Sequence, residues 1–160
     1  HLNRSAPFLL RASSGDFTIQ ATCAPANDSL PSIGGLVIWN DDDNFLRLVW
    51  GSRGKHEVSF EGCIDGQDVI AGRGQLPVGL PQRISLPRQV VLRLVRRGDQ
   101  VTALCSTDGL QWFGVGQAAF PVPPDVEVGL HAVGWIDRTL YPGAFPTGTA
   151  IRFRAFQMWS

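Results

Sequence analysis

Apolar and polar residues alternate with a period of two along most of this chain. Phe17, Ile19 and Ala21 are separated by polar residues, and the same alternation recurs in segments 90–95 and 126–131. This period is typical of strands with one buried face, because successive side chains of a strand point to opposite sides. The pattern predicts eleven strands, near residues 7–11, 16–24, 33–40, 44–51, 55–62, 67–74, 88–97, 100–107, 111–118, 126–134 and 149–158.

Turn residues separate these strands, as in Ser14-Gly15-Asp16, Arg97-Gly98-Asp99 and Thr107-Asp108-Gly109. No stretch of ten residues carries a helical stripe, and the 18 glycines and 11 prolines would interrupt one. Many short strands with frequent turns predict an all-β domain, a two-sheet antiparallel sandwich or a barrel. At 160 residues, the chain is expected to form a single domain over residues 1–160.

The charge balance argues against two classes of partner. Lys and Arg total 14, Asp and Glu total 14, and the formal net charge is zero. A nucleic-acid module or one that binds anionic membranes needs a basic excess, so neither partner is expected. No apolar run reaches the roughly 18 residues of a membrane helix. Because the chain starts at His1 and shows no signal-peptide pattern, we interpret it as a domain excised from a multidomain protein and expect a cytoplasmic location.

The three cysteines, Cys23, Cys63 and Cys105, are far apart and form no CxxC pair. This spacing argues against a zinc site. The odd count favours buried reduced thiols, with one disulfide and a spare thiol as the alternative. The three histidines have no metal-ligand spacing, and no nucleotide-binding loop occurs, so neither a metal nor a cofactor is expected. The acidic run 41–44 lies between two strand patterns and is interpreted as a hairpin turn, not as a calcium loop.

Several blocks of the chain resemble one family when they are taken in order. They include GDFTIQATC at 15–23, GGLVIWNDDDNFLRLVWG at 34–51 and VVLRLVRRGDQVTALCSTDGLQWFGVG at 90–116. The chain resembles, from Ala6 onward, bacterial concanavalin A-like domains of unknown function, related to the regulation-of-enolase domain and to the C-terminal module of β-xylosidases. The resemblance implies a jelly roll with a concave and a convex sheet, fused to neighbouring domains. It implies little about function, because one fold hosts many functions.

Two acidic motifs are candidates for catalytic groups. Glu57, Ser59 and Glu61 share one face of a predicted strand, as the carboxylates of retaining glucanases do on this fold. However, Ser59 stands where those enzymes place an Asp, so we expect the two Glu to be solvated and to pair with Arg on neighbouring strands. Asp108 resembles the Asp of an Asp-box hairpin, in which it holds its own turn while Trp112 packs back under it. No catalytic residue is therefore assigned.

The polar face of the predicted sheet offers groups suited to a sugar. We expect one concave groove lined by Trp39, Arg47, Arg93, Glu127 and His131, with the loop from Gly134 to Thr149 closing over it. Aromatic rings stack on sugar C–H patches, and charged side chains bond hydroxyls. The predicted ligand-contacting residues are Trp39, Arg47, Arg93, His131, Trp135, Asp137, Arg138 and Tyr141.

Three functions remain open on the sequence alone. The first is a noncatalytic recognition module, lectin-like, that binds carbohydrate through the concave face and the loop. The second is a protein-interaction or sensor module of a bacterial signalling or regulatory protein. The third is a degenerate glycoside hydrolase. The expected partner is accordingly a glycan or a protein.

Overall fold

The computed structural model describes residues 7–26, 31–76, 89–132 and 149–160. Its elements are eleven strands, and each strand end lies within two residues of the expected position. The described residues form no helix, and accordingly none that could cross a membrane. The strands are β1 (Phe8–Ser13), β2 (Phe17–Pro25), β3 (Gly34–Asp41), β4 (Asn44–Gly51), β5 (Gly54–Ile64), β6 (Gln67–Gln75), β7 (Val90–Arg97), β8 (Gln100–Ser106), β9 (Phe113–Ala119), β10 (Val126–Ala132) and β11 (Ile151–Trp159).

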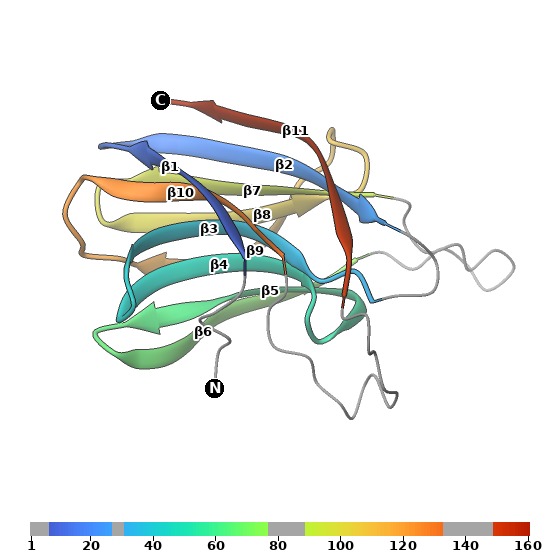
Figure 1. Ribbon diagram of the computed structural model, residues 1–160, viewed down its shortest axis with the longest axis horizontal. Coiled ribbons are helices and arrows are strands. Elements are labelled where there is room, and N and C mark those ends of the chain that lie inside the picture. The colour runs from blue at the N-terminus through green and yellow to red at the C-terminus, as the bar shows by residue number, and fades with distance from the viewer. Residues whose placement is uncertain (1–6, 27–30, 77–88, 133–148) are drawn as a thin grey trace, which may run out of the picture.

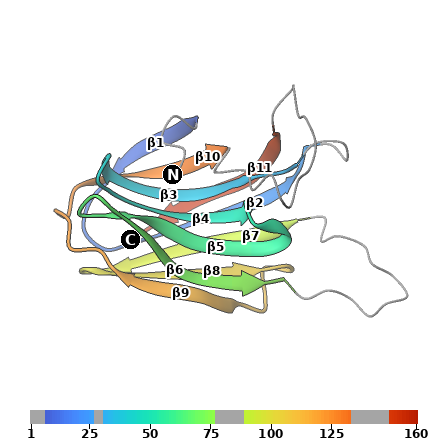
Figure 2. The same cartoon turned by 90° about the horizontal axis from the view of Figure 1, so that it is seen from below.

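The strands form two layers, and every pair of neighbours is antiparallel. The first sheet has the order β1-β10-β3-β4-β5-β6 and the second has the order β9-β8-β7-β2-β11 (Figure 1). Seen from below, β3 and β4 bow with their ends turned away from β7 and β8 (Figure 2). The outer face of the first sheet is therefore concave. The expected jelly roll of two antiparallel sheets is confirmed.

The two sheets are continuous at one seam, where β6 meets β9 through a single pair, Gly72 with Gly116. A Cβ on Gly72 would collide with the carbonyl oxygen of Val115, and one on Gly116 would meet the carbonyl oxygen of Ala71. Only glycine permits the two backbones to approach this closely. The seam joins the layers into one curled sheet of eleven strands.

The hydrophobic core lies between the two sheets, and the expected strand phase is confirmed. The alternation along the strands predicts nine residues in the core between the sheets. Seven of them are fully buried, while Leu130 and Phe153 are partly buried and pack against the core. Trp50 is also in the core, and its indole nitrogen donates a hydrogen bond of 2.9 Å to the Lys55 carbonyl. The seven buried residues are Phe17, Ile19, Leu36, Ile38, Leu92, Leu94 and Val128.

Arg96, at the end of β7, is 2% exposed although it is charged. Its Nε donates to the Gly98 carbonyl at 3.1 Å, and its Nη1 donates to the Pro124 carbonyl at 3.2 Å. Its Nη2 donates to the carbonyls of Val122 at 3.0 Å and Pro123 at 3.2 Å. The guanidinium thus satisfies backbone groups of the segment that leads into β10, and it fixes where β10 starts.

Candidate functional site

The concave face of the first sheet carries Trp39 on β3, directly between Glu127 on β10 and Phe45 on β4. Side chains of directly paired residues point to the same side of a sheet. Glu127 is exposed and Trp39 is half-buried, whereas Phe45 is buried. The face is therefore open at Glu127 near the start of β10 and at the end of β3, and it is closed at Phe45 on β4.

Aromatic contacts hold the Trp39 ring in place. The Trp39 and Phe45 rings are stacked, with centroids 4.9 Å apart and an interplanar angle of 17°. The Phe8 ring of β1 lies on Trp39 at 5.1 Å with a tilt of 47°. Trp39 is consequently fixed before any ligand arrives, and this reduces the entropy lost on binding.

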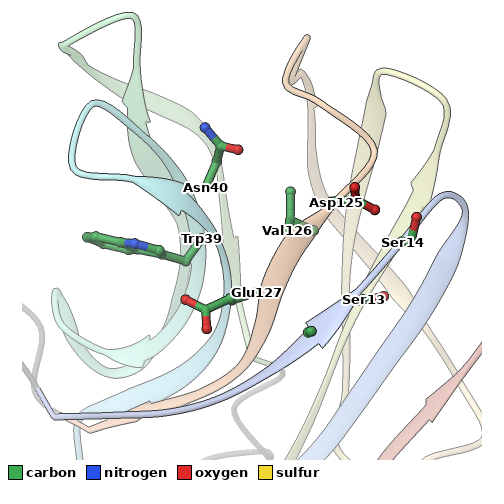
Figure 3. Close-up of a pocket in the computed structure, with 8 residues that line it drawn as sticks. Ser13, Ser14, Trp39, Asn40, Asp125, Val126 and Glu127 are labelled. Atoms are coloured by element: carbon green, nitrogen blue, oxygen red, sulfur yellow. The ribbon is translucent and has the colours of Figure 1, made fainter.

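A pocket of about 470 Å³ opens at this end of the concave face. Trp39 and Glu127 project to the same side from neighbouring strands, and Asn40 stands at the rim (Figure 3). The opposite wall comes from the turn after β1 and the turn before β10, which are joined by a hydrogen bond of 3.2 Å from the Gly15 amide to the Pro124 carbonyl. The pocket is lined by Ala12, Ser13, Ser14, Trp39, Asn40, Asp125, Val126 and Glu127.

The hairpin between β3 and β4 positions Asn40. The Asp41 carboxylate accepts hydrogen bonds from the Asp43 amide at 2.9 Å and the Asn44 side-chain amide at 3.0 Å, and the Asn40 side-chain amide also donates to it. The hydrogen bond from Asn44 lowers the pKa of the Asp41 carboxyl. The expected hairpin turn is confirmed. Within the described residues, no group of three His, Cys, Asp or Glu has a metal-binding arrangement.

Arg47 and His131, which were expected to contact a ligand, share this face with Trp39 but are 0% and 1% exposed. Arg47 Nη2 lies 3.9 Å from Glu61 Oε1, and Arg53 Nη2 lies 3.7 Å from Glu61 Oε2. Burial, reinforced by the charge of Arg47, lowers the pKa of His131 to about 3. These side chains form a buried polar cluster and do not line an open groove.

Arg93 was expected in the same groove, and that placement is wrong. Arg93 lies on β7, paired with Gln20 on β2, so it belongs to the second sheet. Its neighbours Leu92 and Leu94 point into the core, so Arg93 points away from the first sheet altogether. The polar phase of its strand was correctly predicted, but periodicity along a strand does not say in which sheet the strand lies. The predicted loop residues Trp135, Asp137, Arg138 and Tyr141 lie outside the described residues.

The two carboxylates of β5 that are candidates for catalysis are paired with arginines, as expected. Glu57 Oε1 lies 3.9 Å from Arg73 Nε on β6, and Glu61 is paired with Arg47 on β4 and with Arg53. The expectation that both carboxylates are solvated is wrong for Glu61, which is 3% exposed. Such burial is tolerated because two guanidinium groups compensate the charge.

Besides Ala12 and Val126, four polar residues of the pocket were not predicted from the sequence: Ser13, Ser14, Asn40 and Asp125. All four lie at strand ends or in turns, and their types are common wherever a chain turns. The one available indication was their position, since each lies at or near the end of a predicted strand that belongs to the first sheet. Without the strand order, nothing indicated that the three chain segments meet.

The fold is shared with several solved structures. No model of a known protein family matches the chain, and no curated protein matches it. A xylan β-1,4-xylosidase from Bacillus halodurans aligns with a TM-score of 0.71 and 15% identity, over 98% of this chain and 30% of that chain. A Saccharomyces cerevisiae protein of unknown function aligns with a TM-score of 0.68 and 19% identity, over 98% of this chain and 75% of that chain. The carbohydrate-binding module CBM66 from Bacillus subtilis aligns with a TM-score of 0.52 and 16% identity, over 84% of this chain and 83% of that chain.

These likenesses define the class of the fold, a lectin-like β-sandwich. This chain spans about a third of the xylosidase, so it is similar to one part of that enzyme only. At identities below 20%, the similarity extends to the architecture and not to individual residues. The expected relation to bacterial domains of unknown function stays a prediction.

Proposed function

We propose that this chain is a noncatalytic recognition module that binds carbohydrate in the pocket formed by β1, β3 and β10. The observation that carries the proposal is the pairing of Trp39 with Glu127 across two strands beside Asn40. An aromatic ring offers a stacking surface for sugar C–H groups, while carboxylate and amide oxygens accept hydrogen bonds from hydroxyls. The volume of about 470 Å³ is in the range of small-ligand sites.

The similarity to a carbohydrate-binding module and to part of a xylosidase supports a glycan as the ligand. In this proposal the module is fused to a catalytic domain and holds that enzyme on its substrate. The two carboxylates of the pocket, Asp125 and Glu127, are exposed and serve here as hydrogen-bond acceptors.

The test begins with a glycan array that includes xylo-oligosaccharides, followed by calorimetry on the best binder. Trp39→Ala is expected to weaken binding by about thirtyfold or more, as truncation of a central Trp commonly does. Because Trp39 also stacks on Phe45, the exposed variant Glu127→Gln provides a second measurement that spares the fold. Phe113→Ala, which removes an exposed aromatic side chain from β9 of the second sheet, is the matched control.

Binding that survives both Trp39→Ala and Glu127→Gln would overturn this site. An array without binders would favour the alternative, a protein-interaction or sensor module. The support for that alternative is that one fold can host many functions, and not a specific contact.

A further inference from the structure

The charges of the chain are segregated between the two sheets, although they cancel overall. The five strands of the second sheet contain five arginines and neither Asp nor Glu. Arg97 points outward at the end of β7 and donates hydrogen bonds to the carbonyls of Phe17 and Arg96. Three more of these arginines, Arg93, Arg152 and Arg154, are on the outer face, because their partners Gln20, Ala24 and Thr22 alternate with the core residues of β2. Within the described part of the chain, no ion pair joins these three to a carboxylate. Among the described residues, these three arginines therefore carry positive charge that no ion pair compensates.

Arg93 is held in one orientation. Gln20 Oε1 accepts hydrogen bonds from Arg93 Nε at 2.9 Å and from Nη2 at 2.7 Å. The guanidinium carbon lies 3.7 Å from the centroid of the Trp112 ring and 5.7 Å from that of Trp159. A guanidinium ordered in this way loses little further entropy when it binds an anion.

The turn that follows β8 places the Trp112 ring against the Arg93 guanidinium. Asp108 Oδ1 accepts the amides of Leu110 and Gln111, both at 2.8 Å, and Ser106 Oγ accepts the Gly109 amide at 2.8 Å. The amide of Gln111 contributes most to lowering the pKa of the Asp108 carboxyl. The expectation that Asp108 holds its own turn is confirmed, and Gly109 in this turn has a positive φ of 76°. Trp112 packs on Arg93 and presents an aromatic surface on the outer face of the sheet.

Along β11, the outer face continues from Trp159 through Gln157 to Arg154 and Arg152. Trp159 is 43% exposed, and both arginines are exposed. The eight residues of strand from 152 to 159 extend roughly 20 Å at the usual rise per residue. That length suits a polymeric ligand with repeated groups better than a single small anion.

We propose that this outer face is a second binding site, distinct from the pocket, for an acidic polysaccharide with uronic acid units. The carboxylates of such a chain would pair with Arg93, Arg152 and Arg154, its sugar rings would stack on the exposed Trp159, and Gln157 would bond hydroxyls. Arg and carboxylate match as fork to fork. Single-stranded nucleic acid also stacks on aromatic rings beside arginines, but it carries a phosphate on every nucleotide and is bound by grooves lined with many basic side chains, whereas this face offers three arginines spaced along two strands.

The experiment measures binding of the complete 160-residue chain to polygalacturonate by calorimetry, with methyl-esterified polygalacturonate as the matched ligand without charge. Wild type is expected to bind the acid form at least tenfold more tightly than the ester. The double variant Arg152→Gln/Arg154→Gln and the single variant Arg93→Gln should each weaken binding about tenfold, as expected for lost charged hydrogen bonds. Arg152 and Arg154 are exposed, so the double variant is expected to keep the wild-type melting temperature.

Two control variants distinguish this site from the pocket and from a general attraction of the acidic polymer to exposed arginines. Arg11→Ala removes an exposed arginine from β1, on the other sheet, and should leave polygalacturonate binding unchanged. Glu127→Gln should also leave it unchanged, so that failure of the pocket and failure of this site are distinguishable. The proposal would be overturned if wild type bound the acid and the ester forms equally tightly, or if Arg11→Ala weakened polygalacturonate binding as much as the arginine variants of the second sheet do. Tighter binding of oligothymidylate than of polygalacturonate would also overturn it.

Discussion

Arg96 illustrates at the residue scale how one buried charge can organise a distant part of the chain. Four carbonyl oxygens accept from its guanidinium, and three of them belong to the segment 122–124 just before the pocket wall. A buried charge is tolerated only when its donors are satisfied. Arg96 is thus a positioning residue for Asp125 and Glu127, which follow this segment.

Arg96→Ala is expected to lower the free energy of unfolding by roughly 3 kcal/mol or more, because the variant leaves several carbonyls without a donor. Chemical denaturation measures this loss. Arg97→Ala, the exposed neighbour, is the control and should cost far less. Equal effects of the two substitutions would contradict the role assigned to Arg96.

His131 makes stability depend on pH. Its pKa is about 3 in the folded chain against 6.5 ordinarily, because burial and the Arg47 charge disfavour the imidazolium. Below about pH 6.5, His131 is therefore protonated in the unfolded chain but stays neutral in the folded chain. The stabilisation from neutral His131 is complete above that pH and is lost progressively toward pH 3.

Between pH 7 and pH 5, this one group is expected to reduce the free energy of unfolding by about 2 kcal/mol. His131→Phe, which retains a ring next to Phe8, should show a correspondingly shallower pH dependence. Denaturant unfolding of both proteins at the two pH values provides the comparison. Parallel curves would mean that His131 is protonated in the folded state.

The strand is the scale at which the sequence was most informative. Period-two alternation located all eleven strands and predicted correctly that Trp39, Arg47, Glu127 and His131 share one face. Alternation is a local property of the pleat, so it can be recognised without knowing the partners of a strand. It could not show that Arg93 lies in the other sheet, or that Arg47 is buried, because both depend on strand order and on covering segments.

Leu92→Ala tests the assigned phase of β7. Leu92 is fully buried in the core, so its truncation should cost roughly 2–5 kcal/mol of unfolding free energy. Val95 lies on the same strand with the opposite phase, and Val95→Ala is expected to cost clearly less. Thermal unfolding of the two variants gives the ranking, and a reversed ranking would mean that the strand phase is wrong.

At the scale of the whole molecule, the two sheets present different chemistry to their surroundings. The first sheet carries the pocket with Trp39 and Glu127, and the second carries arginines and Trp159. Composition could not reveal this division, because a net charge of zero is compatible with any distribution of the charged residues. The pocket could be predicted only in part, because turn residues from three separate chain segments complete it.

The whole domain is expected to lack hydrolytic activity. Glu57 and Glu61 are each paired with arginine, and Glu61 is buried, so no pair of accessible carboxylates lies along β5. Incubation with xylo-oligosaccharides should release no reducing sugar. Cleavage that disappears in Glu57→Gln would restore the glycoside hydrolase interpretation.

The position of β1 and β11 at the two outer edges has a consequence for how the chain folds. Strands β3 to β6 pair in chain order through short turns, as do β7 to β9, whereas Phe8 pairs with His131 and Gln20 with Gln157. Pairing strands that are far apart in the chain loses loop-closure entropy before stabilising contacts form. The locally paired strands β3 to β6 and β7 to β9 should therefore form first, and the edge strands β1 and β11 last. The chain is accordingly expected to fold slowly for its size. In hydrogen exchange, the amides of β1 and β11 should open at lower free energy than those of β4 and β7.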